Sequence, residues 1–170
     1  MLNGRTVILQ PFGPSDITPE YIGWLNDPDV VRYSNQRFRR HDAATCQTYL
    51  TSFAGTANQF LAIRREGVMI GTMTAYMSTH HGTADMGILV GDKRVWGKGA
   101  GGDAWTTLLQ HLLARGDIRK VTGGALRCNE GMVRIMQNAG MKPDGIRVAQ
   151  ELVGDQPQDM LHFAKFRVVG

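Results

Sequence analysis

The sequence predicts a mixed α/β fold, in which a central and mostly antiparallel sheet is flanked by helices on both faces. Its 170 residues, 42% hydrophobic and 20% charged, fit one globular domain over 1–170. Segments of strand composition and segments of helical periodicity share the chain, which favours a sheet packed between helices. A strand, a long amphipathic helix and another strand follow one another over 83–126, which is typical of a parallel crossover.

The first forty residues predict one strand and a helical region. Residues 6–12 have strand composition and end in turn residues. Thr18 and the proline after it are suited to open a short helix, and Asp27 and its following proline are expected to restart that helix. Residues 32–41 are irregular and basic, so they are expected to form a loop.

The middle of the chain predicts a helix and three antiparallel strands. Asp42 is a suitable cap for a helix whose apolar residues fall at positions i, i+3, i+4 and i+7. Glu66 and Gly67 form a hairpin signal between the first two strands. The three expected strands are 59–65, 68–77 and 83–90.

The second half predicts two helices and three strands. The first helix follows a glycine cluster and has a Trp and Leu stripe ending before Gly116, and the second begins after Asn129 and ends at Gly140. The expected strands are 120–126, 147–153 and 160–168.

Composition and charge exclude several classes of protein. No stretch approaches the roughly 20 apolar residues of a membrane span, and the N-terminus has no apolar core of a signal peptide, so a cytoplasmic protein is expected. A net charge of +4 is too mild to indicate a nucleic-acid partner. Cys46 and Cys128 make neither a disulfide framework nor a metal motif, so no metal is expected.

The glycine cluster is the segment that most clearly indicates a function. It reads Arg-Val-Trp-Gly-Lys-Gly-Ala-Gly-Gly over 94–102 and opens a helix. Glycines let a backbone approach an anion closely, and the first amides of a helix are unpaired at the positive end of its dipole. The segment is therefore predicted to bind a phosphate or pyrophosphate.

Two nucleotide-binding motifs compete for this cluster. A Walker loop needs four residues between its glycines and then Lys-Ser/Thr, but five residues separate Gly91 from Gly97 and Lys98 precedes glycine. The dinucleotide pattern GxGxxG is matched by Gly97, Gly99 and Gly102. Its mechanism requires glycines directly after a strand and an acidic residue ending the next one, and neither is present.

The cluster also resembles the Arg/Gln-x-x-Gly-x-Gly/Ala loop of the GCN5-related N-acetyltransferase (GNAT) superfamily, which Arg94, Gly97 and Gly99 satisfy. Trp-Leu-Asn-Asp-Pro at 24–28 is similar to the branch of ribosomal-protein alanine and amino-sugar acetyltransferases. Asn129, with the helix ending in Gly-Met at 140–141, is similar to the family's Asn…Gly-Phe segment.

This resemblance implies a fold with a splayed parallel strand pair and a set of acetyl-CoA contacts. The loop would hold the pyrophosphate, the end of the preceding strand would pair with the pantetheine arm, Trp96 would lie along the cofactor, and Asn129 would contact its arm. The implied cofactor-binding residues are Ile88, Leu89, Val90, Arg94, Trp96, Gly97, Lys98, Gly99, Ala100, Gly101, Gly102 and Asn129.

The catalytic groups are less strongly indicated. Asp85 is the leading candidate for a general base, because relatives often have Glu on this strand and apolar neighbours can raise a carboxyl pKa. His80, His81, Glu130 and Glu151 are weaker candidates. Where many members have a tyrosine that protonates the leaving thiolate, this sequence has Met136, so no general acid is implied.

The resemblance implies an enzyme that transfers acetyl from acetyl-CoA to a primary amine by direct attack. Arg32 and Arg37, in a basic loop that also contains Arg39 and Arg40, are expected to contact an anionic acceptor. A small amine such as an amino sugar or amino acid is favoured slightly over a protein N-terminus, and a homodimer is left open. The alternative is a non-catalytic acyl-CoA-binding module on the same fold.

Overall fold

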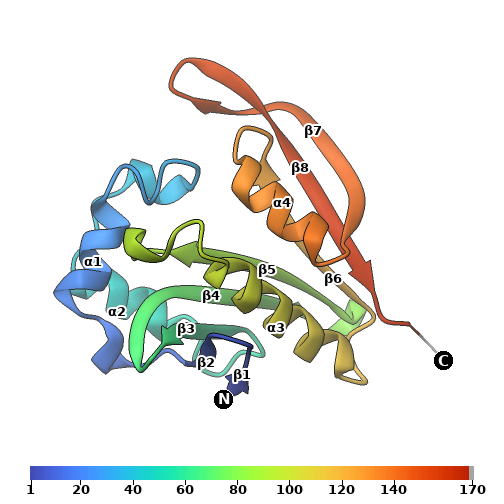
Figure 1. The fold of residues 1–170 in the computed structure, drawn as a ribbon, viewed down its shortest axis with the longest axis horizontal. Helices are drawn as coiled ribbons and strands as arrows, with labels where there is room; N and C mark the ends of the chain where they lie inside the picture. The colour runs from blue at the N-terminus through green and yellow to red at the C-terminus, as the bar shows by residue number, and fades with distance from the viewer. Residues whose placement is uncertain (169–170) are drawn as a thin grey trace.

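The computed structural model describes residues 1–168, and these form one eight-stranded sheet in the order β1-β2-β3-β4-β5-β6-β8-β7 (Figure 1). Neighbouring strands are antiparallel except β5 and β6, which are parallel. This is the mixed, mostly antiparallel sheet that the sequence predicts. The strands are β1 (Leu2–Asn3), β2 (Ile8–Pro11), β3 (Gln59–Arg65), β4 (Val68–Ser78), β5 (Thr83–Val90), β6 (Lys120–Leu126), β7 (Lys142–Val153) and β8 (Gln156–Phe166).

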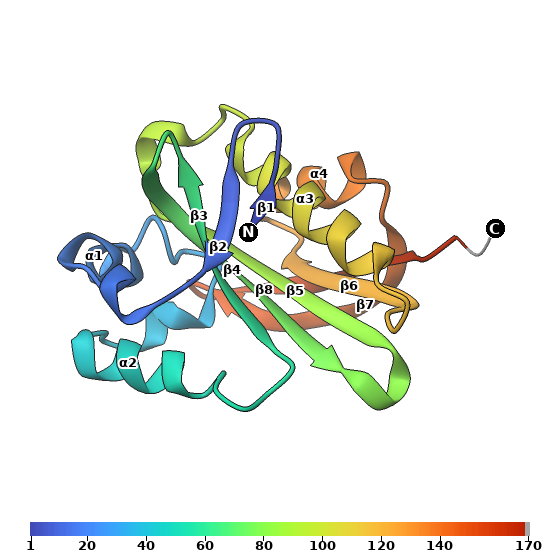
Figure 2. The same ribbon diagram turned by 90° about the horizontal axis from the view of Figure 1, so that it is seen from below.

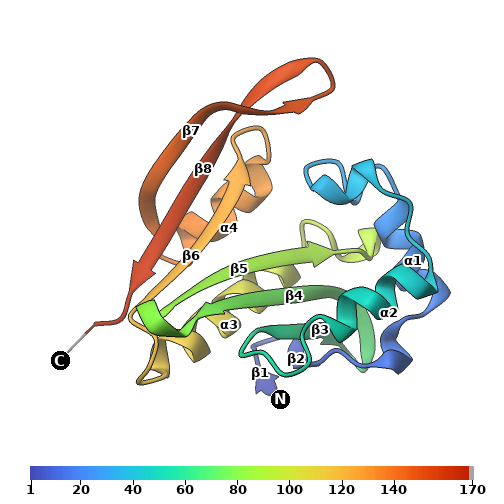
Figure 3. The ribbon, with the colours of Figure 1, turned by 180° about the vertical axis from the view of Figure 1, so that it is seen from behind.

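Helices cover both faces of this sheet, as predicted. Figure 1 shows α3 and α4 in front of it, and Figure 3, from the opposite side, shows α2 in front and α3 behind. Each pair of helices covers its own apolar cluster, one centred on Trp105 of α3 and the other on Trp24 of α1. The helices are α1 (Pro19–Asn26), α2 (Ala43–Thr51), α3 (Ala100–Ala114) and α4 (Glu130–Asn138). Within residues 1–168, no helix combines the length and apolar character needed to cross a lipid bilayer.

The predicted helix restart at Asp27 is wrong. Asp27 closes α1 instead, and its carboxylate accepts a hydrogen bond from the Asp29 amide at 2.9 Å and pairs with Lys93 at 2.7 Å. A side chain that bonds the backbone two residues later stabilises a turn in place of a helical first turn. The next short element is the 3₁₀ helix η2 (Asn35–Phe38), inside the predicted basic loop.

The last two strands form a longer hairpin than the sequence predicts. The strand expected at 147–153 begins at Lys142, and the one expected at 160–168 runs from Gln156 to Phe166. Most of β7 is exposed at the sheet edge, and its pairing with β8 is irregular near Gly145 and again between Arg147 and Glu151. An exposed, irregular edge strand lacks the alternation of apolar and polar residues by which a strand is found in sequence.

The parallel pair separates halfway along its length. Register pairs between β5 and β6 run only from Thr83–Lys120 to Met86–Gly123, although both strands continue. Beyond that point β6 stays paired with β8 and β5 stays paired with β4, so the two halves of the sheet diverge (Figure 3). The splayed pair implied by the family resemblance is therefore present.

The N-terminal hairpin is fastened to the first turn of α3 by one carboxylate. Figure 2 shows β1 beside α3. Asp103 accepts hydrogen bonds from the amides of Arg5 at 3.0 Å, Thr6 at 2.6 Å and Val7 at 3.2 Å. Partial burial alone raises the pKa of Asp103, but these bonds outweigh it and hold the pKa below its ordinary value.

Replacing Asp103 with alanine is expected to lower the free energy of unfolding by about 1–2 kcal/mol at neutral pH. Because the folded-state pKa is lowered, the stabilisation is complete above the pKa of the unfolded chain, about 3.9, and is lost as pH falls through the folded value. Urea unfolding from pH 7 to pH 3 should show that the difference in unfolding free energy between the variant and the unmodified protein narrows below about pH 4. The control Asp117→Ala, which breaks an exposed pair with Arg115, should leave the urea midpoint close to that of the unmodified protein. A difference in unfolding free energy that stayed the same from pH 7 to pH 3 would contradict the prediction.

Candidate active site

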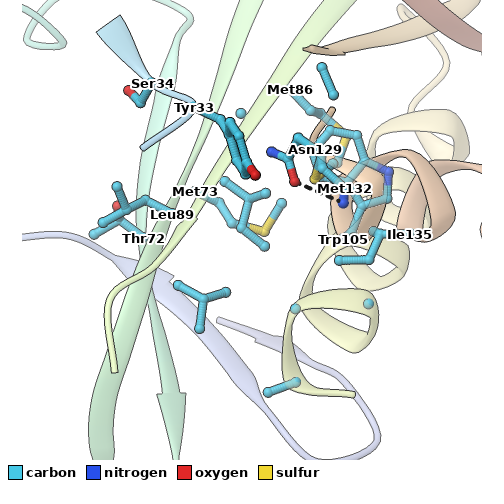
Figure 4. A pocket seen from close by; sticks show the side chains of 18 of the residues that line it. Tyr33, Ser34, Thr72, Met73, Met86, Leu89, Trp105, Asn129, Met132 and Ile135 are labelled. Carbon is cyan, nitrogen blue, oxygen red and sulfur yellow. Dashed lines mark hydrogen bonds between the residues drawn. The ribbon is translucent and has the colours of Figure 1, made fainter. Parts of the chain in front are cut away.

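A large cleft opens where β5 and β6 separate. Its volume is about 1210 Å³. The diverging strands form its floor, the first turn of α3 and the exposed side of α4 form one wall, and the segment before η2 forms the other. Figure 4 shows Met86, Leu89, Asn129 and Ile135 around it. Many of the cofactor-binding residues predicted from the sequence are therefore brought to one cavity.

The glycine loop supplies unpaired backbone donors at one end of this cleft. Gly97 and Gly99 have φ of +71° and +82°, the left-handed region that favours glycine. Gly99 is the N-cap of α3, and among the described residues the amides of Ala100, Gly101 and Gly102 have no backbone acceptor. A helix N-terminus with free amides facing a cleft is a site for an anion.

The edge of β5 supplies a second row of unpaired groups. The Gly91 amide donates to the Ile70 carbonyl of β4 at 2.9 Å. Because the main-chain groups of an antiparallel strand face the same neighbour at every second residue, every second residue of β5 before Gly91 also bonds to β4. The main-chain groups of Ile88 and Val90 consequently face the opening, where β6 has left. The Val90 carbonyl accepts a hydrogen bond from the Trp96 indole at 2.9 Å, whereas Ile88 has no strand partner on that side.

Asn129 lies on the wall formed by α3 and α4, and only one of its two side-chain amide atoms is hydrogen-bonded. Its Oδ1 accepts a hydrogen bond from the Met132 amide at 3.2 Å and caps α4. Within residues 1–168 its Nδ2 has no hydrogen-bond partner, and the residue lines the cleft. The capping role and a role in binding are therefore compatible.

Two basic residues of the loop do not line the cleft. Arg94 is exposed and forms a double hydrogen bond with Asp92, at 2.9 and 3.0 Å, which lowers the pKa of the Asp92 carboxyl. Lys98 is exposed at the rim. The positive charge expected from Arg94 is thus partly neutralised by its own neighbour.

Asp85 lies just outside the cleft, at its closed end. It is two residues before Gly87, which lines the cleft, and on the same sheet face, so the separation is roughly 7 Å. Its carboxylate accepts a hydrogen bond from the Thr122 hydroxyl at 2.5 Å. Asp85 is exposed at the sheet surface, but partial desolvation of its carboxylate by neighbouring side chains raises its pKa, while the Thr122 bond and the charge of His162 act in the other direction.

The two arginines predicted to contact the acceptor substrate differ in whether their side chains are already hydrogen-bonded within the protein. Arg37 donates to the carbonyls of Ser34 at 2.8 Å and Leu152 at 2.9 Å, with its side chain only 16% exposed. It therefore ties η2 to the β7–β8 hairpin, and its donors are largely used within the protein. Arg32 is exposed and lies 5.3 Å from the centre of the Tyr33 ring.

Other candidates lie elsewhere, and one residue of the cleft has no signal in the sequence. His80 and His81 are exposed in a 3₁₀ turn, and neither lines the cleft. Met136 is fully buried in the core, so it leaves no donor where many relatives have tyrosine. Tyr33 points into the cleft with its hydroxyl end toward Asn129 (Figure 4). Its irregular loop has no periodicity from which that direction could be inferred.

These features fit one another as parts of a single binding site. Free amides at a helix N-terminus suit a pyrophosphate, and an unpaired strand edge beside them suits an extended arm with amide groups. The fold and the site define an acyltransferase that takes its acyl group from a CoA thioester. The sequence agrees, because an acetyltransferase (GNAT) domain model matches residues 6–142, and the chain belongs to this family. It is an N-acetyltransferase whose acetyl donor is acetyl-CoA.

Solved structures share this fold at low sequence identity. A GNAT-family acetyltransferase from Bacillus anthracis has a TM-score of 0.81 and 15% identity, with 98% of each chain covered. Spermidine N-acetyltransferase from Vibrio cholerae, solved with CoA and spermine, has a TM-score of 0.83 and 14% identity, covering 95% of this chain and 96% of that one. Ribosomal-protein-alanine N-acetyltransferase from Brucella melitensis has a TM-score of 0.78 and 15% identity, covering 94% and 99%. No curated protein sequence is similar enough to this chain to count as a match.

Proposed function

We propose that this protein acetylates a primary amine by direct attack on acetyl-CoA, and that a small amine is favoured over a protein N-terminus. The observation that carries this proposal is the splay between β5 and β6 beside the α3 N-terminus, because it joins an anion site to an open strand edge. The Vibrio cholerae enzyme, which has the same fold and was solved with CoA and spermine, supports the proposal because one protein of this fold binds CoA and a small amine together.

Residues of the glycine loop, the β5 floor and the start of α4 hold the donor in this proposal. The free amides of Gly97 and of residues 99–102 bind the pyrophosphate, with Lys98 and Arg94 adding positive charge at the rim. The open edge of β5, Ile88 to Val90, pairs with the pantetheine arm, and the free Nδ2 of Asn129 donates to the same arm. The Trp96 indole donates a hydrogen bond to the Val90 carbonyl at the end of β5.

The acceptor must lose a proton before it attacks. An amine with a pKa near 7.7–8.0 is already partly neutral at pH 7, whereas a lysine amine, near 10.4, costs about 4.6 kcal/mol to deprotonate. A weakly basic amine therefore places a small demand on a general base. Asp85, two residues along β5 from Gly87 of the cleft lining, takes the proton through an intervening water.

Replacing Asp85 with asparagine is expected to lower kcat at least about 100-fold while changing the CoA dissociation constant by less than about 2-fold. Because the pKa of Asp85 is raised, kcat/KM of the unmodified enzyme should fall as pH drops through a value above the ordinary 3.9 of an aspartate. That acidic limb should be absent from the variant. Glu66→Gln, at the exposed β3–β4 turn, is the control. Turnover at the unmodified rate in the Asp85 variant would remove this residue from the mechanism.

The reaction class is tested by thiol release from acetyl-CoA with amino sugars, amino acids and short peptides as acceptors. We expect turnover with at least one primary amine and an acetylated product by mass spectrometry. Tight CoA binding by calorimetry without turnover on any acceptor would instead establish a non-catalytic CoA-binding module.

A further inference from the structure

A second cavity lies beside the active-site cleft, and arginine dominates its lining. It has a volume of about 560 Å³ and lies between the basic loop and the tip of the β7–β8 hairpin at Val153 and Gly154. Figures 1 and 3 both show the segment between α1 and α2 opposite that tip. Four arginines and no acidic residue of the described chain line this cavity: Arg32, Arg37, Arg39 and Arg40.

Three of these guanidinium groups are available to a ligand. Arg37 is committed to its two carbonyl acceptors and has Glu151 at 3.9 Å. Within residues 1–168, Arg32, Arg39 and Arg40 form no hydrogen bond or ion pair through their side chains, and all three are exposed. Arg37 therefore fixes the cavity wall, and the other three give the cavity its unpaired positive charge.

The carboxylates that line the adjoining cleft, in contrast to these arginines, are all paired within the protein. Two acidic residues line it, and both are already bound: Asp29 pairs with Lys93 at 2.8 Å, and Asp103 holds the N-terminal hairpin. An acceptor with several ammonium groups would find no free carboxylate in the lining. An acceptor with an anionic group would find three unpaired arginines next to the cleft.

One segment of chain separates the two cavities. Leu25 lines both of them. Tyr33, Ser34 and Gln36 face the cleft, whereas Arg32 and Arg37, from the same segment, face the second cavity. The two cavities therefore meet at this segment, with the arginines on one side of it and the cleft on the other.

We propose that the acceptor is a small phosphorylated primary amine, whose phosphoryl group is held by Arg32, Arg39 and Arg40 while its amine enters the cleft. The planar, forked guanidinium matches phosphate oxygens, and a dianion uses more than one arginine where a single carboxylate would not. This proposal rests on the function proposed above and names the substrate class for the same site.

The first test compares matched acceptors with and without a phosphate, such as glucosamine 6-phosphate and glucosamine, or O-phosphoethanolamine and ethanolamine. We expect kcat/KM to be at least about 10-fold higher for the phosphorylated member of a pair, and the preference to shrink as salt increases. Inorganic phosphate should compete with that acceptor. Equal rates for both members of every pair, or a preference confined to acidic peptides, would overturn the proposal.

The second test removes the arginines singly and together. Arg32→Gln, Arg39→Gln and Arg40→Gln should each raise KM for the phosphorylated acceptor at least about 3-fold, and the triple variant about 30-fold. KM for the unphosphorylated partner should not change. Arg65→Gln, at the end of β3 and outside both cavities, removes the same charge and is the control. An equal effect of the control, or an equal effect on both acceptors, would contradict the assignment.

Two further measurements separate this proposal from failures elsewhere. CoA binding to the triple variant should match that of the unmodified protein, so a loss of binding would show that the arginines serve the donor. Acetyl-dephospho-CoA should give the same acceptor preference as acetyl-CoA, because the 3′-phosphate of the donor lies outside the proposed site. If CoA binds but no amine of any kind is acetylated, the proposed function itself fails.

Discussion

Replacing Gly99 with valine is expected to weaken CoA binding at least about 10-fold. Gly99 has φ of +82° at the N-cap of α3, a conformation that costs an L-residue roughly 1–2 kcal/mol and a β-branched one more. A Cβ there has no neighbouring atom within 4 Å, so the backbone conformation is the source of strain. The strain is relieved when the loop rotates, which turns the first amides of α3 away from the pyrophosphate. Calorimetric titration with CoA measures the effect.

Gly67 provides a matched control for this variant. It has φ of +80° in the β3–β4 turn and equally open space around it, but lies outside the cleft. Gly67→Val should therefore lower stability about as much as Gly99→Val and leave CoA affinity unchanged. Equal CoA affinities of Gly99→Val and the unmodified protein would remove the loop from the binding site.

Replacing Gly91 with alanine is expected to lower the free energy of unfolding by about 3 kcal/mol. A Cβ at this position would lie 2.0 Å from the Trp24 ring. Trp24 is 8% exposed and belongs to the apolar cluster under α1 and α2, so it has little room to move. Chemical denaturation gives the size of the loss.

Two further variants show whether this collision is the cause. Gly23→Ala, one residue before Trp24 in α1 and with open space around it, should raise stability by roughly 0.5–1 kcal/mol. Adding Trp24→Ala to Gly91→Ala should cost less than the sum of the two single changes, because it removes the Cγ and ring atoms that the new methyl group would meet. If Gly91→Ala proved as stable as the unmodified protein, the close packing of Trp24 on the backbone would be disproved.

Local signals in the sequence predicted the elements that have a strong hydrophobic periodicity or clear turn and capping residues. The stripe of α3 and the hairpin at Glu66 and Gly67 are confirmed, and so is the helix that begins after Asn129. The errors fall where a side chain interacts with the backbone or where an edge strand carries no alternating pattern. Asp27 forms a turn in place of a helix, and β7 begins five residues earlier than predicted.

The functional residues divide in a similar way. The glycine cluster indicates an anion site by itself, because conformational freedom and a helix start are both properties of consecutive residues. The sequence does not show which arginines are paired within the protein and which are free to bind a ligand. Arg94 and Arg37 are as basic as their neighbours, yet the fold places one beside Asp92 and the other against two carbonyls.

The sequence by itself thus determined the class of fold, the family and the position of the glycine loop at the start of α3, since each depends on neighbouring residues or on short motifs. The tertiary structure decided where β5 and β6 separate, that Tyr33 faces Asn129, and that three unpaired arginines line a second cavity sharing Leu25 with the cleft. These features depend on contacts between segments far apart in the chain, and such contacts are set by packing rather than by any local pattern.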